Sequence, residues 1–168
     1  MKKENIVESP EELDRCVEIG ARHTSEIGKP ALIFNSEYGK LSKNQKLLLS
    51  SFDSNGIARF DRYGDNITVK MLDLSCLTAY TGKEYSLFSR NDRQFLVVGT
   101  ERGIHISKEL SDTLIKRGYK WTGHTHVGDT EYCLMPSDAD YETLRKFHQK
   151  RSVIFNSVGK FYVFGEEE

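Results

Sequence analysis

The sequence predicts a single α/β domain in which strands and helices follow one another along the chain. Segments that alternate apolar and polar residues are typical of half-buried strands, and several occur between residues 57 and 164. Segments with helical spacing of apolar residues lie among them, introduced by serines that can cap a helix. A length of 168 residues suits one domain, and 38% hydrophobic residues suffice for one core.

The N-terminal part, residues 1–75, begins with a strong helix start. Ser9 can cap the helix, Pro10 fits its first position, and Glu12 completes a capping box. Residues 31–34 are expected to form a short strand, and residues 41–52 are ambiguous between helix and loop. The sequence leaves open whether this part belongs to the same domain as the rest of the chain.

The middle of the chain predicts strands joined by tight turns. Residues 63–66 have turn composition and are expected to join the first two strands, and residues 90–93 the next two. We expect these strands at residues 57–60, 67–71, 85–89, 94–98 and 103–106.

The C-terminal half combines two helices with further strands. Ser107 is expected to cap a helix that ends near Gly118, and residues 119–122 form a strand that leads into a Gly-His-Thr-His segment. A second helix is expected from Asp138 to Arg151. The closing hairpin is expected to pair residues 153–155 with residues 161–164.

Composition excludes several classes of protein. The 24 basic and 25 acidic residues leave a net charge of −1, which gives no general attraction to nucleic acid or to an anionic membrane. No apolar run is long enough to span a bilayer, and the first residues lack the apolar stretch of a signal peptide. Three widely spaced cysteines do not form a disulfide framework. We expect a cytoplasmic protein, with signal-independent export left open.

The segment with chemical character begins at His124-Thr-His126. Two histidines separated by one residue point the same way on an extended backbone, so both imidazoles can reach one ion. A carboxylate from the start of the next helix would be a third ligand, and three protein ligands plus water form the open arrangement of a catalytic zinc. Such an ion lowers the pKa of its water to about 7. The reaction then needs a nearby carboxylate that exchanges the proton.

This segment, together with Ser137-Asp-Ala-Asp140, resembles the JAMM motif of the JAB/MPN-domain zinc metalloproteases. The likeness covers residues 75–165, and the part from residue 83 to residue 126 looks like JAB-type domains of bacterial and phage-related proteins. It implies a cytidine-deaminase-like fold, a mixed curved sheet flanked by helices, with its metal-binding core in residues 76–165. It also implies that His124, His126 and Asp140 bind Zn²⁺, and that Ser137 stabilises the oxyanion.

The same resemblance implies a general base, a glutamate on a strand upstream of the histidines. Glu84 matches that placement because it opens a predicted strand. Glu101 lies in a turn-like segment, and Glu109 lies in a first helical turn, where acidic residues are favoured anyway. The implied activity is hydrolysis of peptide or isopeptide bonds. The resemblance also implies a protein or peptide substrate, ubiquitin-like tails among them. From the net charge we expect no nucleic-acid or membrane partner.

The chain departs from the family pattern at two places. Val127 replaces the usual proline, and the spacer of residues 127–136 is longer than is usual in the family. A longer loop changes closure entropy only slightly, so ligation can survive it. Asp129 and Asp138 remain competing carboxylate ligands. We expect this loop to border the substrate cleft.

Each part of the motif also has a purely structural interpretation. Ser137-x-x-Asp140 matches a helix capping box, and His-x-His also occurs by chance on exposed strands. The alternative function is therefore a catalytically inactive MPN-type protein-interaction module. A zinc deaminase is less well supported, because its His-x-Glu and Pro-Cys-x-x-Cys signature is missing.

Overall fold

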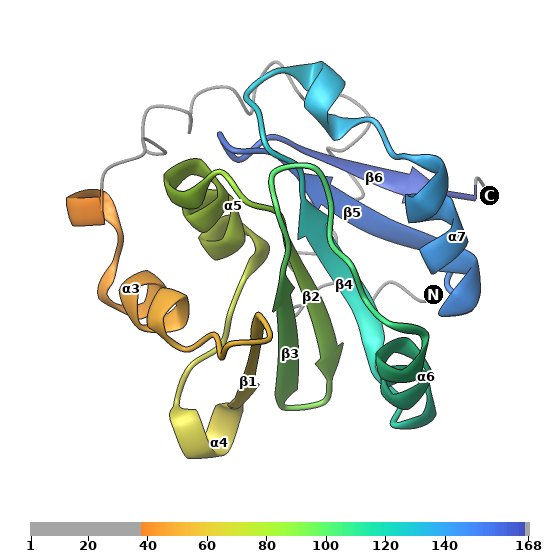
Figure 1. Cartoon of the computed structure of the whole chain (residues 1–168), viewed down its shortest axis with the longest axis horizontal. Coiled ribbons are helices and arrows are strands. Elements are labelled where there is room, and N and C mark those ends of the chain that lie inside the picture. Colours follow the sequence, from red (N-terminus) through yellow and green to blue (C-terminus); the bar gives the residue numbers. More distant parts are fainter. Residues whose placement is uncertain (1–37, 167–168) are drawn as a thin grey trace.

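The computed structural model describes residues 38–166, and it places six strands in one mixed sheet (Figure 1). The strand order is β1-β3-β2-β4-β5-β6, with β4 and β5 parallel and all other neighbours antiparallel. The strands are β1 (Ile57–Asp61), β2 (Tyr85–Arg90), β3 (Arg93–Val98), β4 (Lys120–Thr125), β5 (Arg151–Phe155) and β6 (Phe161–Gly165). The helix expected to start at Ser9 and the strand at residues 31–34 lie outside the described residues.

Helices cover both faces of the sheet, which confirms the expected mixed α/β architecture with flanking helices. They are η3 (Tyr38–Lys40), α3 (Lys43–Ser50), α4 (Arg62–Asp65), α5 (Met71–Thr81), α6 (Lys108–Lys116), η4 (Glu131–Leu134) and α7 (Asp138–Lys146). Buried side chains of α3 and α5 share one apolar cluster with one face of the strands, and those of α6 and α7 share a second cluster with the other face. No helix within residues 38–166 is long and apolar enough to cross a membrane.

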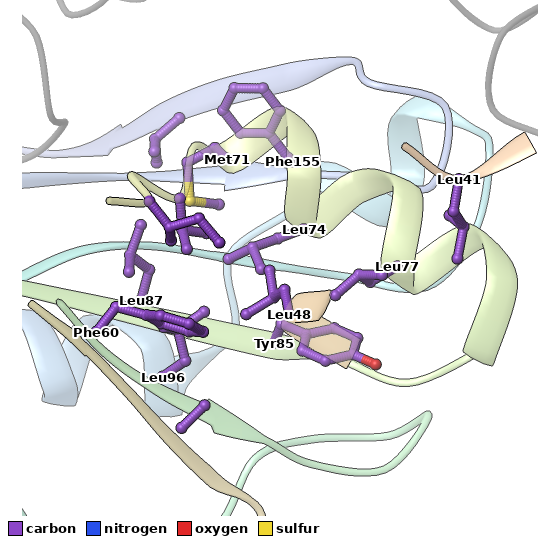
Figure 2. Packing of buried hydrophobic residues seen from close by; sticks show 14 of the residues in the cluster. Leu41, Leu48, Phe60, Met71, Leu74, Leu77, Tyr85, Leu87, Leu96 and Phe155 are labelled. Atoms are coloured by element: carbon purple, nitrogen blue, oxygen red, sulfur yellow. The ribbon is translucent and has the colours of Figure 1, made fainter. Parts of the chain in front are cut away.

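The α5 face carries the larger apolar core, shown in Figure 2. Met71, Leu74 and Leu77 of α5 are almost completely buried, and they lie over Tyr85 and Leu87 of β2. Burial of this apolar surface is the main force that fixes α5 on the sheet. Because β2 and β4 are neighbours, this packing also fixes β4, which carries His124 and leads into His126.

The predicted strand at residues 67–71 is wrong, although the pattern that suggested it reflects real burial. Ile67 and Val69 are buried, but the main chain of Val69 pairs with a side chain, donating to Gln94 Oε1 (2.7 Å) and accepting from Gln94 Nε2 (2.8 Å). The expected turn at residues 63–66 overlaps α4, which ends at Asp65 and is capped by Asn66 in the left-handed conformation (φ 56°). Strand β1 pairs with β3 instead.

Two further expectations need correction. Residues 103–106 form no strand, and Ile104 and Ile106 pack against the α6 side from an irregular segment. Helix α7 ends at Lys146 and does not reach Arg151, because His148 adopts a left-handed conformation (φ 56°). The ambiguous residues 41–52 contain α3, which begins with a capping box between Ser42 and Gln45.

Candidate metal centre

The end of β4 directs two histidines to the α7 side of the sheet. The main chain stays extended past the strand because the N–H of His126 donates to Phe155 O (2.9 Å). His124 and His126 therefore lie on the same side, with Thr125 pointing to the opposite one. Their Nε2 atoms lie 3.1 Å apart. This agrees with the side-chain direction that the His-x-His spacing predicts.

The first turn of α7 brings Asp140 to these histidines. Ser137 caps the helix: its Oγ accepts from the N–H of Asp140 (3.1 Å), and its own N–H donates to Asp140 Oδ2 (2.9 Å). This reciprocal capping box fixes the direction of the carboxylate. Asp140 Oδ1 lies 3.1 Å from His124 Nε2, and Oδ2 lies 3.4 Å from His126 Nε2. The capping and ligand interpretations of Ser137-x-x-Asp140 are therefore geometrically compatible.

The three side chains fit a metal ion in both chemistry and spacing. Each offers one ligand atom, and these atoms all lie within 4.8 Å of one another. Ligand atoms at about 2.0–2.1 Å from a tetrahedral zinc are about 3.3–3.4 Å apart, close to the 3.1–3.4 Å separations found here. Two imidazole nitrogens and a carboxylate oxygen suit zinc among other divalent ions. The group can therefore hold a metal ion.

The two histidines are held in different ways. His126 Nδ1 lies 2.8 Å from the main-chain oxygen of Cys133, so this nitrogen carries the proton and Nε2 keeps its lone pair for the site. His124 is stacked on Trp121 (ring centroids 5.0 Å apart), and its buried Nδ1 has no hydrogen-bond partner among residues 38–166. A hydrogen bond therefore orients His126, whereas packing orients His124.

Glu84 lies directly before β2, on the side of the sheet that faces the histidines. It is two residues from Ser86, which pairs with His124 across the β2–β4 ladder, and alternation puts Glu84 and Ser86 on one face. The side chain is buried, and the main-chain N–H donates to Thr100 O (2.9 Å). Glu84 does not belong to the three-ligand group. It is therefore an unligated carboxyl beside that group.

Burial shifts the pKa of Glu84 upward to about 7. The charge of His126 opposes this shift and that of Asp140 adds to it, so Glu84 lies within electrostatic range of both. A carboxyl with such a pKa both accepts and donates a proton near neutral pH.

The pKa values of His124, His126 and Asp140 shift in different directions. Burial lowers the pKa of His124. Burial alone would lower the pKa of His126 too, but the hydrogen bond that its protonated ring donates to the Asp140 carboxylate, together with the charges of Glu84 and Asp140, raises it. Burial would raise the pKa of Asp140, but its hydrogen bonds to both histidines hold it well below the usual range. Asp140 is therefore a carboxylate at neutral pH, as a metal ligand must be.

Five other acidic residues are alternatives for the general base or for the carboxylate ligand, and all five lie outside the three-ligand group. Their side chains are exposed: Glu101, Glu109, Asp129, Glu131 and Asp138. Sequence reasoning missed two residues that support the site, Thr78 beneath Thr125 and Asn156 beside the loop that follows His126. No local pattern could have indicated them, since each contact joins distant segments.

The site thus combines a group that can hold a metal ion with a buried carboxyl that can exchange a proton. Comparisons with protein-family models, with curated proteins and with solved structures find no significant match to this chain. The functional argument therefore depends on the geometry and chemistry of the site itself.

Proposed function

We propose that this chain is a zinc-dependent hydrolase that cleaves peptide or isopeptide amide bonds, with the JAB/MPN fold and the JAMM arrangement of residues. The observation that carries the proposal is the pairing of Glu84, whose pKa is raised to about 7, with the His124, His126 and Asp140 group. The order of elements supports it: the β2–β3 hairpin, α6, β4 with the histidines, a loop, and α7 with the aspartate.

In this proposal His124, His126 and Asp140 hold the zinc. Bound there, zinc would supply Lewis-acid chemistry, polarising a carbonyl oxygen and lowering the pKa of a water. The protein's own contribution is preparation of the ligands: Asp140 is kept ionised, and His126 is kept in one orientation by Cys133 O. These features reduce the reorganisation that metal binding requires.

Glu84 acts as the general base and then as the general acid. It takes a proton from the attacking water and later returns it to the leaving amine, so the cleaved bond yields a carboxylic acid and an amine. Its pKa near 7 suits both steps at neutral pH. Ser137 is assigned the oxyanion role, since its oxygen accepts from the N–H of Asp140 and its own hydroxyl proton remains available to donate.

The surface beside the site supports a polypeptide substrate. Tyr132 and Met135 in the loop between the ligands are 88% and 64% exposed, and Tyr141, next to Asp140, is 37% exposed. Tyrosine and methionine are enriched in the parts of a surface that bind other proteins. Peptide bonds and isopeptide bonds, including those of ubiquitin-like tails, are the substrates we propose, in a cytoplasmic setting.

The test pairs metal uptake with hydrolysis in wild-type protein and in Glu84→Gln. We expect about one zinc per chain in both proteins, with hydrolysis of a peptide or isopeptide substrate only in the wild type, because an amide cannot act as a base near neutral pH. Zinc uptake is measured by elemental analysis, and cleavage by mass spectrometry. Glu101→Gln is the control, since Glu101 is exposed and lies outside the three-ligand group.

Three outcomes would change the assignment. Failure of the wild-type chain to take up any transition metal would reject the proposal. An active Glu84→Gln protein would move the base to Glu101, Glu109 or Glu131. Zinc uptake without cleavage of any peptide or isopeptide substrate would favour the inactive interaction module.

A further inference from the structure

The loop between the metal-ligand residues, residues 127–136, is bound to the turn between β5 and β6. The N–H of Gly128 donates to Ser157 Oγ (2.9 Å), and the N–H of Ser157 donates to Gly128 O (2.8 Å). A third bond runs from Asn156 Nδ2 to Thr130 O (3.1 Å). The loop is thus attached at two successive places, and neither contact involves a metal-ligand residue.

Asn156 is the central residue of this attachment. It is fully buried, and its Oδ1 accepts from the main-chain N–H groups of Val158 (3.1 Å) and Lys160 (3.0 Å). These two bonds fix the direction of the amide, so the Nδ2 group must face Thr130 O. Only an amide side chain offers two acceptor sites on one end and donors on the other. The sequence position therefore requires asparagine for both turn and loop.

Thr130 is connected to His126 by two hydrogen bonds that involve Cys133, in the single helical turn η4. The same Thr130 oxygen accepts from the N–H of Cys133 (3.2 Å), which closes η4. The oxygen of Cys133 lies 2.8 Å from His126 Nδ1. A short series of hydrogen bonds therefore joins the Asn156 amide to the ring of a proposed metal ligand.

We propose that Asn156 is a positioning residue for His126. By fixing Thr130 and η4, it places the Cys133 oxygen so that His126 holds its proton on Nδ1 and directs Nε2 to the site. This inference rests on the metal group of the proposed function, and it does not require that the chain hydrolyses anything. Partners that orient a ligating histidine typically change metal affinity by about 10–100-fold when lost.

The variant that tests the loop contact most directly is Asn156→Asp. The carboxylate keeps an oxygen for the N–H groups of Val158 and Lys160, but it replaces the donor to Thr130 O with a second acceptor. The loop contact is lost while the turn is retained. The control is Gln94→Ala. Gln94 lies on β3, and its buried amide also accepts from a main-chain N–H and donates to a main-chain oxygen, both of Val69.

Cobalt(II) is a suitable probe because its visible absorption reports ligand geometry. We expect Asn156→Asp to lower cobalt affinity by about 10–100-fold and to change the absorption spectrum. Gln94→Ala should lose stability in chemical unfolding and keep the wild-type affinity and spectrum. An Asn156→Asp protein that is folded and retains both wild-type values would overturn the proposal.

A second variant covers the case in which Asn156→Asp does not fold. Asn156→Ser is uncharged and keeps an oxygen that can accept from the N–H of Val158, but it removes the Nδ2 donor to Thr130 O, so a loss of cobalt affinity in the same direction is expected. Wild-type cobalt binding in a folded Asn156→Ser would then overturn the proposal. A wild-type chain that binds cobalt without hydrolysing any substrate leaves the positioning role standing while the proposed hydrolysis fails. A wild-type chain that binds no cobalt overturns both.

Discussion

The two sides of β4 at its C-terminal end hold buried polar groups of different kinds. On the α5 side, the hydroxyl of Thr125 accepts from the N–H of Tyr85 (2.9 Å) and lies 2.6 Å from the hydroxyl of Thr78. On the α7 side, His124 and His126 lie within 3.4 Å of the Asp140 carboxylate. The hydroxyl groups on the α5 side are neutral and hydrogen-bonded to one another. The side chains on the α7 side can gain or lose a proton.

Under the proposed function, this difference separates groups that stabilise the fold from groups that hold the metal and exchange a proton. A paired hydroxyl satisfies the backbone and contributes to stability. A buried glutamate beside an aspartate carries a raised pKa and weakens the fold at neutral pH, so its presence favours a functional explanation. Variants on the α5 side should therefore change stability alone, whereas variants on the α7 side should change metal binding.

The largest expected effect is the loss of zinc in Asp140→Asn. The amide keeps an oxygen that can accept from the N–H of Ser137, so the helix cap survives, but the ligand charge is gone. With only three protein ligands there is little redundancy. The zinc affinity should fall by more than the roughly 10–100-fold that loss of an orienting partner costs. Competition with a chromophoric chelator measures it.

Thr78→Val is the matched variant on the other side of the strand. It leaves the Thr125 hydroxyl without its 2.6 Å partner and should cost about 1–3 kcal/mol of unfolding free energy. Zinc affinity should stay at the wild-type value. Comparable zinc loss in the two variants would show that the sides of β4 are not independent.

A separate effect is expected in the pH dependence of the stability of the metal-free protein. The pKa of Glu84 rises from the 4.5 of a free carboxyl to about 7 on folding, so the folded chain binds more protons than the unfolded chain between these values. The stability contribution of this carboxyl therefore falls as pH rises from 4.5 to 7. Glu84→Gln should remove this fall, so the stability of the variant relative to wild type should increase between pH 4.5 and pH 8.

Chemical unfolding in the presence of a chelator provides this measurement at both ends of the pH range. A difference between Glu84→Gln and wild type that stays constant across the range would mean that folding does not change the protonation of Glu84. The proposed general base would then lose its main physical support.

Local spacing is what made the candidate site predictable. The directions of His124 and His126 follow from strand alternation, and that of Asp140 follows from a capping box, so each depends only on neighbours in the sequence. The sequence left Asp129 and Asp138 open because it does not determine how a ten-residue loop closes.

Contacts between distant segments were not predictable in the same way. Val69 was expected in a strand, but its main chain pairs with the side chain of Gln94, 25 residues away. Asn156 contacts Thr130 across 26 residues, and neither residue has a distinctive local pattern. Such pairings depend on the order of strands in the sheet, which periodicity does not encode. Helix α5 was missed for a different reason: its apolar residues are spread around the helix, so it has no distinct polar face.

The smallest expected change in stability belongs to Ser137, which is assigned both a capping role and an oxyanion role. Ser137→Ala removes the oxygen that accepts from the N–H of Asp140 and should cost about 1 kcal/mol of unfolding free energy. Ser107→Ala is the matched control, because Ser107 caps α6 through the N–H of Leu110 at the same 3.1 Å and lies outside the metal group. Both variants should lose similar stability and retain zinc. Only Ser137→Ala should also lose hydrolysis, on the order of 10²-fold, because an oxyanion donor is removed. Equal hydrolysis rates in the two variants would reduce Ser137 to a helix cap.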